Sequence, residues 1–390
     1  MQHHKIAGMN IGILLPKSGE YPAIALELMQ AMKAALSGKI SMEELNFFTE
    51  NVGFGESEKD VYEKTEKLIL LHNTDVIVAY IDNKVIPVLE PLLFASNKIM
   101  IVVNAGANYP FNKVPQPNII YVTLQQAYAA TKAVDLAAHN QGAYATSFYD
   151  CGYSIGTGML ENYFSQNNQV LFNYINNQKK AEPFHINELI QFLEQQSTTT
   201  LQLLCNFDEQ MAALFYYKLN EYTYAKDLSL VVSPMMLTPR ALNSNATSYP
   251  YKIQGYATWL PFLDTDANKA FVASVLKINK TQPSLFSFSG WQVGLLLAHL
   301  FAAFKKDGLV PEELPQLLSN VELETAAGKY IFDSRTNHFI ATTTWKVTLE
   351  AASTTPLFEA KESSVSDWHA FVDAQPTGVS AGWMNTYLCY

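Results

Sequence analysis

Apolar runs alternate with amphipathic stretches along most of this chain. Residues 11–15 form an apolar run that ends at Pro16 and a polar turn. A run of this length predicts a strand buried on both faces of a sheet. Beyond Pro22, apolar residues recur at helical spacing from Leu26 to Leu36, which predicts a helix that begins near the proline.

The same order of strand and helix recurs as far as residue 232. The pattern predicts strands at 45–48, 76–79, 99–103, 143–148, 169–174, 201–205 and 228–232, and helices at 59–71, 85–94, 155–164, 186–193 and 209–219. Strands that alternate with helices require parallel sheets with right-handed crossovers and helices on both faces. The predicted fold class is therefore α/β, with doubly wound parallel sheets.

The pattern changes after residue 250. It predicts a strand at 251–256, helices at 267–278, 288–304 and 311–318, and antiparallel strands at 329–332 and 338–349. The tail from 351 to 390 is rich first in Ser and Thr and then in aromatic residues. We expect these aromatic side chains to pack onto the rest of the protein.

Length and charge narrow the class of protein. The 390 residues exceed one domain of ordinary size, so two lobes are expected. A formal net charge of -10 argues against nucleic acid or an anionic membrane as partner, because both attract basic surfaces. Cys151, Cys205 and Cys389 lack metal-ligand spacing and can form at most one disulfide. The longest apolar runs are too short to predict a membrane span.

The loops after the predicted strands form the candidate site. In doubly wound sheets, ligands bind beyond the carboxyl ends of the strands. Small, amide and aromatic residues gather in these loops, and this mixture suits hydrogen bonds and ring contacts with a small ligand. The candidate ligand-binding residues are Ser18, Tyr21, Tyr80, Asp82, Asn83, Asn104, Ala105, Gly106, Ala107, Asn108, Tyr153, Asn206, Phe207, Met235, Tyr256 and Trp259.

Ordinary structural roles compete with ligand contact at these positions. Most of the 21 Tyr and 22 Phe are expected to pack in the core, and Asn often satisfies the backbone of its own loop. Asp after a strand is a frequent helix cap. We interpret Asp82 as a ligand contact and Asp150 as a cap.

Five segments share their order and spacing with a known family. They are the strand and glycine turn at 11–19, the strand at 75–80, the strand and small-residue loop at 98–107, the turn at 150–156 and the aromatic-led helix from Phe286. Over residues 10–340 this order resembles that of type I periplasmic-binding proteins, in the branched-chain amino-acid receptor branch.

The resemblance implies two lobes that close on a ligand about a hinge of three chain crossings. The crossings would lie near 121–124, 254–258 and 328–333. The N-terminal lobe would then contain 9–121 and 257–328, the C-terminal lobe 122–256 and 329–350, and residues 351–390 would be an extension. The resemblance also implies an ABC permease as partner, no cofactor, and a location outside the inner membrane after removal of an export signal.

The ligand is the point at which the sequence departs from this family. Amino-acid receptors commonly use hydroxyl residues after the third and fourth strands to bind the ligand carboxylate, and an acid in the second lobe to bind its ammonium. Here Asp82, Asn83 and residues 104–108 occupy the first positions, and Met235 and Met236 occupy the second. Met and aromatic side chains supply adaptable apolar walls. We therefore predict an apolar, aromatic or polyhydroxylated solute rather than an α-amino acid.

Two other classes of function remain as alternatives. The same clamp could serve as the ligand-sensing module of a signalling system, and an α/β enzyme is the third interpretation. The sequence lacks a nucleophile elbow, a Walker loop and an HExxH motif, and the glycine-rich run at 152–158 has the wrong spacing for a dinucleotide fingerprint. No catalytic residue, metal or cofactor is predicted.

Overall fold

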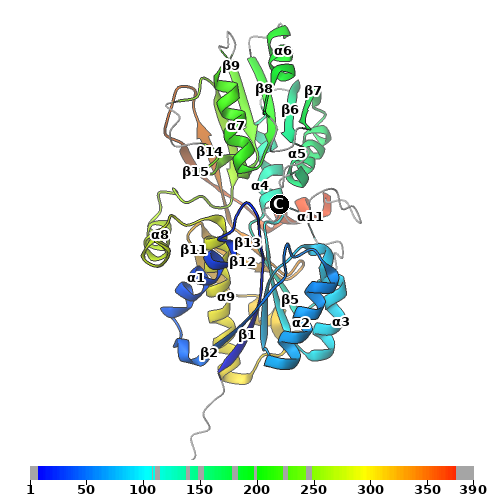
Figure 1. Ribbon diagram of the computed structural model, residues 1–390, viewed down its shortest axis with the longest axis vertical. Helices are drawn as coiled ribbons and strands as arrows, with labels where there is room; N and C mark the ends of the chain where they lie inside the picture. The colour runs from blue at the N-terminus through cyan, green and yellow to red at the C-terminus, as the bar shows by residue number, and fades with distance from the viewer. Residues whose placement is uncertain are drawn as a thin grey trace, which may run out of the picture.

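Two lobes, each built on one sheet, lie one above the other in the computed structural model (Figure 1). The predicted α/β class with two doubly wound lobes is confirmed. The structure describes residues 8–107, 109, 115–137, 141–147, 153–177, 183–196, 200–222, 227–242 and 248–374, without the side chains of Tyr153, Ser154 and Asp307.

The lower lobe contains an eight-stranded sheet in the order β11-β12-β13-β5-β4-β3-β1-β2. β1 to β5 pair in parallel, whereas β12 runs antiparallel to both of its neighbours. β3 and β4 are buried at every position because helices cover both faces. The strands are β1 (Met9–Leu15), β2 (Leu45–Asn51), β3 (Val76–Tyr80), β4 (Ile99–Asn104), β5 (Ile119–Thr123), β11 (Glu322–Thr325), β12 (Gly328–Asp333) and β13 (His338–Ala341).

Helices on the two faces of this sheet bury separate apolar clusters. α1 (Ile24–Ser37), α8 (Asp266–Asn279) and α9 (Leu285–Asp307) cover one face, and α2 (Glu58–His72) and α3 (Ile86–Ser96) cover the other. The short helices of this lobe are η1 (Met42–Glu44), η2 (Asn83–Val85), η5 (Pro311–Glu313) and α10 (Leu314–Leu318).

Helix α9 is the central helix of this lobe. Residues Leu285–Lys306 are apolar and long enough to cross a membrane, but 78% of the most apolar window is buried inside the protein, which is typical of a core helix. α9 packs closely on α1 because Gly290 and Gly294 carry no side chain at the contact. A Cβ atom on Gly290 would lie 2.2 Å from the carbonyl oxygen of Leu28.

The upper lobe contains a seven-stranded sheet in the order β15-β14-β10-β9-β8-β6-β7. β14 runs antiparallel to β10 and β15, and the remaining pairs are parallel. Its strands are β6 (Gln141–Ser147), β7 (Gln169–Asn176), β8 (Thr200–Asn206), β9 (Asp227–Val232), β10 (Lys252–Ala257), β14 (Thr343–Leu349) and β15 (Leu357–Glu362). Its helices are α4 (Gln126–Ala133), η3 (Val134–Leu136), α5 (Tyr153–Ser165), α6 (Asn187–Gln195), α7 (Glu209–Asn220) and η4 (Pro234–Leu237).

The chain passes between the sheets after β5, after β10 and after β13. The first two crossings follow β5, which ends at Thr123, and β10, which ends at Ala257. The third crossing, predicted near 328–333 with 329–350 in the upper lobe, lies later in the chain, because β12 and β13 belong to the lower sheet and only β14 joins the upper one. β13 pairs with β5 through His338 and Tyr121, so the crossing falls near Thr342. Alternation of apolar and polar residues predicts a strand but does not specify which sheet it joins.

Side chains tie the three crossings together. Thr258 Oγ1, at the second crossing, donates a hydrogen bond to the carbonyl of Leu124 at the first, over 2.8 Å. Gln125 has a left-handed backbone with φ of 51°, and its Nε2 donates to the carbonyl of Phe339 over 2.8 Å. Its Oε1 accepts from the backbone N–H of Ala341 over 3.4 Å. These bonds fix the spacing of the hinge strands.

Two elements of the tail, β15 and α11, pack with the rest of the protein. β15 forms the edge of the upper sheet, and α11 (Val365–Ala374) packs beside the hinge with Trp368 and Phe371 buried. The prediction that aromatic side chains of the tail pack onto the body is confirmed for these two residues. Trp383 and Tyr387 lie outside the described residues. Cys205 is a free, buried thiol. Cys151 and Cys389 lie outside the described residues.

Gly290→Ala tests the packing of α1 on α9. The added methyl group meets the backbone of α1, so we expect a loss of about 1–3 kcal/mol in the free energy of unfolding, as in overpacked cores. Chemical denaturation measures it. Gly38→Ala is the control, because Gly38 has φ of -84° and open space around its Cα. Equal stability of the two variants would contradict the close packing.

Candidate functional site

The two lobes touch across the cleft through Tyr21 and Glu209. Tyr21 follows β1 in the lower lobe, and Glu209 begins α7 after β8 in the upper lobe. The phenol hydroxyl of Tyr21 donates a hydrogen bond to Glu209 Oε2 over 3.3 Å. The guanidinium of Arg240, also in the upper lobe, lies 5.5 Å from the centre of the Tyr21 ring. Both contacts join residues beyond the carboxyl ends of parallel strands, where this class of sheet binds ligands.

A cavity of about 710 Å³ lies beside this contact, and both lobes line it. Its size falls within the usual range for small-molecule sites. Lower-lobe residues around the start of α1 and the start of α9 form one side, and upper-lobe residues from α7 and the segment after η4 form the other. The lining residues are Tyr21, Pro22, Ala23, Ile24, Glu27, Glu209, Thr238, Pro239, Arg240, Trp259, Leu260, Pro261, Phe262, Val272, Gln282, Pro283, Ser284, Leu285 and Phe286.

Aromatic side chains make the apolar wall of the cavity rigid. The indole of Trp259 stacks on Phe288 with ring centres 4.8 Å apart, and its Nε1 donates to Asn268 Oδ1 over 2.9 Å. Phe286 packs edge-on against Tyr21 at 5.3 Å. Side chains held in this way present a preformed surface to an apolar ligand, which lowers the entropic cost of binding.

Two carboxyl groups, those of Glu209 and Glu27, line the cavity opposite its apolar wall. Asp208 accepts a hydrogen bond from Met211 N over 2.8 Å and so caps α7, which places Glu209 in the first turn. Burial raises the pKa of Glu209, against the opposing effects of hydrogen bonds from Thr238 and Tyr21 and of the charge on Arg240.

The second carboxyl group belongs to α1. Burial raises the pKa of Glu27, and a hydrogen bond from Ser284 opposes the shift. Ser284 is also the N-cap of α9, where its Oγ accepts from the backbone N–H of Phe286 and Ser287. The cavity therefore offers hydrogen-bond acceptors at two places and one guanidinium.

The loops after β3 and β4 bond mainly within the lower lobe. Asp82 is 3% exposed and caps η2, because its Oδ1 accepts from Lys84 N over 2.8 Å. Asn104 Nδ2 donates to Asn83 Oδ1 over 2.9 Å, and Asn104 Oδ1 accepts from Gly106 N over 2.9 Å. A structural role thus accounts for the capping carboxylate and for both ends of the Asn104 amide.

The loop after β4 also braces the first crossing. The carbonyls of Asn104, Ala105 and Gly106 accept from the backbone N–H groups of Leu124, Gln126 and Ala127. Gly106 has φ of 65°, and a Cβ there would lie 2.7 Å from Gln125 N. Only glycine fits this close approach without strain.

Tyr21 and Trp259 are the two predicted site residues that line the cavity. Ser18 accepts a hydrogen bond from Tyr21 N over 3.1 Å and so shapes the loop that carries it. Most of the others are buried outside the lining: Tyr80, Asp82, Asn83, Asn104, Ala105, Ala107, Asn206, Phe207, Met235 and Tyr256. Gly106 supports the hinge, Asn108 lies outside the described residues, and the side chain of Tyr153 does as well.

Met235 and Met236 are core residues with no exposed surface. The sequence-based expectation that methionine stands where an acid would face the ligand therefore needs correction. The upper lobe does supply an acid, Glu209, but from the first turn of α7, which follows β8. Both methionines lie in η4, and Tyr216 donates a hydrogen bond to the carbonyl of Met236 over 3.1 Å.

Sequence reasoning missed Glu27, Glu209, Arg240 and Phe286 as lining residues. For Glu209 a signal exists, since it lies two positions after the candidate residue Phe207. Phe286 begins the helix that carries the family resemblance. Glu27 and Arg240 carry no local signal, because only the meeting of the lobes brings them to one cavity.

Comparison with known proteins agrees with this architecture. A family model described as periplasmic binding protein matches residues 8–353. An ABC transporter substrate-binding protein from Sphaerobacter thermophilus has a TM-score of 0.72 at 16% identity, covering 91% of this chain and 98% of that one. An ABC transporter solute-binding protein from R. palustris in complex with benzoate has a TM-score of 0.67 at 18% identity, with coverages of 92% and 98%.

A third structure carries an amino acid. LivJ from Streptococcus pneumoniae, a branched-chain amino acid transporter substrate-binding protein in complex with isoleucine, has a TM-score of 0.64 at 10% identity, covering 91% of this chain and 100% of that one. No curated protein sequence matches this chain. The fold and the interlobe cavity define a two-lobed solute-binding protein. The chain belongs to the periplasmic binding protein family, and the predicted resemblance is confirmed.

Asp82 should make stability depend on pH. Burial raises its pKa from 3.8 to about 6, against the hydrogen bond and charge of Lys84. The folded state therefore binds this proton more tightly than the unfolded state, and stability falls as the pH rises from 4 through 6, by about 3 kcal/mol in total.

Asp82→Asn stays neutral and keeps an oxygen for Lys84 N, so we expect denaturation curves at pH 4 and pH 7 to differ less than those of the wild type. Asp227→Asn, at an exposed position of β9, is the control and should keep the wild-type profile. An unchanged pH dependence in Asp82→Asn would show that this carboxyl is ionised normally.

Proposed function

We propose that this chain captures a small solute between its lobes outside the inner membrane and delivers it to an ABC-type importer. The observation that carries the proposal is the cavity of about 710 Å³ lined by both lobes. A ligand that contacts both lobes stabilises the closed arrangement, because it binds that arrangement better than the open one. Membership of the periplasmic binding protein family supports delivery to a permease that recognises the closed form.

The lining favours a small aromatic or apolar solute as ligand. Trp259 and Phe286 supply ring surfaces, and Leu260 and Pro261 extend the apolar wall. Related folds in the R. palustris proteins hold benzoate, 3,4-dihydroxybenzoic acid and p-hydroxybenzoic acid, which supports an aromatic class.

The polar groups of the cavity refine this class. Glu209 and Glu27 accept hydrogen bonds, so a ring that carries a donor such as a hydroxyl group can satisfy a buried carboxyl. Arg240 can pair with a carboxylate on the same ligand. A hydroxylated aromatic acid meets both requirements. In an aliphatic α-amino acid such as leucine, the side chain leaves the ring surfaces poorly filled.

Isothermal titration with a matched set of ligands tests the class. We expect 4-hydroxybenzoate to bind more tightly than benzoate, because its hydroxyl group can donate one further hydrogen bond to the carboxyl of Glu209 or Glu27, a difference of about tenfold for one net hydrogen bond. L-Leucine, a polyol and a nucleobase complete the set. Tight binding of leucine with no binding of the aromatic acids would refute the proposed ligand class.

Val272→Trp tests the location of the site. Val272 lies in α8 and lines the cavity, so an indole at this position should fill the space and weaken ligand binding at least about tenfold. Ala273→Trp places the same side chain one residue along, on an exposed position of the same helix, and should bind as the wild type does. Equal affinity of both variants would place the ligand elsewhere.

A further inference from the structure

The tail makes a fourth passage between the lobes. β15 belongs to the upper sheet, and α11, which follows it, docks on the lower lobe beside the hinge (Figure 1). Both elements lie beyond residue 353, where the match to the family ends. The hinge implied by the family has three crossings, and this passage lies outside the residues that the family model matches.

The fourth passage runs directly beside the third. Ser363 N donates to the carbonyl of Thr342 over 2.9 Å, and the hydroxyl groups of Ser363 and Thr344 lie 3.2 Å apart. Lys132, on α4 of the upper lobe, donates from its ammonium to Ser363 Oγ over 3.1 Å. The start of α11 is thus fixed to the hinge.

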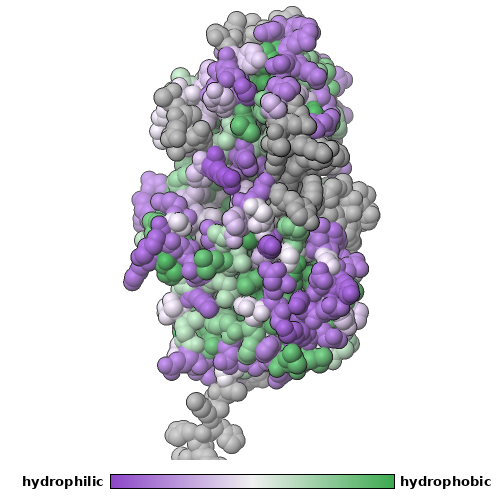
Figure 2. All heavy atoms as spheres, in the orientation of Figure 1, coloured by the Kyte–Doolittle hydropathy of each residue, from purple (hydrophilic) through white to green (hydrophobic). Residues whose placement is uncertain are grey.

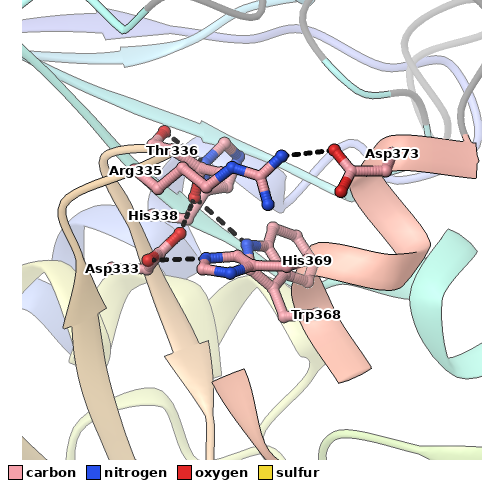
Figure 3. Close-up of polar contacts among 7 residues, drawn as sticks. All are labelled: Asp333, Arg335, Thr336, His338, Trp368, His369 and Asp373. Carbon is pink, nitrogen blue, oxygen red and sulfur yellow. Dashed lines mark hydrogen bonds and ion pairs between the residues drawn. The ribbon is translucent and has the colours of Figure 1, made fainter. Parts of the chain in front are cut away.

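Polar contacts bind α11 to the turn between β12 and β13 of the lower lobe (Figure 3). The indole Nε1 of Trp368 donates to Thr336 Oγ1 over 3.1 Å. His369 Nε2 lies 3.0 Å from Asp333 Oδ1, and Arg335 forms an ion pair with Asp373 at the end of the helix. Three side chains of α11 thus bind the turn between β12 and β13.

Apolar contacts join the same helix to both lobes. Trp368 and Phe371 pack edge-on against Tyr128 of α4, with ring centres 5.7 and 5.5 Å apart. With Ile340 of β13 and Val372 they form a separate buried cluster. The members of this cluster come from the upper lobe, the lower lobe and the tail, so the cluster exists only while the lobes keep their present relation.

The neighbour of this cluster in the lower lobe is His338. Its ring stacks on Tyr121 at 4.4 Å and lies 5.3 Å from the ring of Trp368. Burial lowers the pKa of His338 to about 4, although its bond to the carbonyl of Thr336 and the charge of Asp333 act in the opposite direction. The His338 ring beside Trp368 is therefore uncharged at neutral pH.

We propose that α11 is a latch on the hinge, which stabilises the arrangement in which Tyr21 and Glu209 touch across the cleft. Tyr128 of α4 and Ile340 of β13 share one buried cluster with Trp368, so a rotation of the lobes that parts α4 from β13 would expose apolar surface. The exposed apolar surface opposes that rotation. The latch regulates the site described above, so its effect on ligand affinity rests on the proposed function, whereas its effect on lobe separation does not.

Small-angle scattering of the full-length protein without ligand tests the latch. Trp368→Ala removes the indole that contacts both lobes, and we expect a larger radius of gyration than in the wild type. Val365→Ala, in the first turn of α11 with an exposed side chain, is the matched control and should scatter as the wild type does. Far-UV circular dichroism checks that each variant is folded.

A second variant keeps the test decisive if Trp368→Ala fails to fold. The double substitution Thr336→Val and Asp373→Asn removes a hydrogen-bond acceptor and an ion pair while it leaves the apolar cluster in place. We expect this double variant to have a larger radius of gyration than the wild type as well. A folded variant of either kind with the scattering curve of the wild type would overturn the proposal.

Ligand affinity separates this inference from the proposed function. If the site binds as proposed, the dissociation constant of Trp368→Ala should rise about tenfold, because the closed form becomes a smaller fraction of the population. Expansion without ligand binding in any variant would support the latch and reject the ligand class. Unchanged scattering with normal ligand binding would reject the latch and support the ligand class.

Discussion

The bonds that Gln125 and Thr258 make between the three crossings are the constraint on which the rest of this structure depends. They hold strands from distant parts of the chain at one place and therefore set how the two sheets face each other. The left-handed backbone at Gln125 turns the chain from β5 into α4, and Gly106 allows the loop after β4 to lie against that turn. Both lobes are packed α/β layers, so we expect relative motion of the lobes to occur at the connections between them.

The cleft follows from that geometry. Parallel strands end at the facing edges of both sheets, so Tyr21 and Glu209 meet although 188 positions separate them in sequence. Burial raises the pKa of the Glu209 carboxyl, although the hydrogen bond from Tyr21 acts in the opposite direction, and the cavity beside this contact is lined by Trp259 and Phe286. Under the proposed function, binding of a solute in this cavity and relative rotation of the lobes are two aspects of one equilibrium.

The order of strands and helices and the doubly wound class were predictable, because burial on both faces leaves continuous apolar runs such as those of β3 and β4. The site was predictable only in part. Position after a strand identified Tyr21 and Trp259, but the same rule selected Asn104 and Met235, whose partners lie inside their own lobe. A local pattern does not distinguish a side chain that faces the cleft from one that supports a loop.

By itself the sequence determined the fold class and the approximate extent of most helices and strands, because periodicity and order are local properties, and it carried a resemblance to the family. Tertiary structure decided which sheet receives β12 and β13, that Glu27, Glu209 and Arg240 share one cavity, and that α11 spans the hinge. Each of these depends on contacts between segments far apart in the chain. Such contacts are selected by the packing of whole layers, which no single segment encodes.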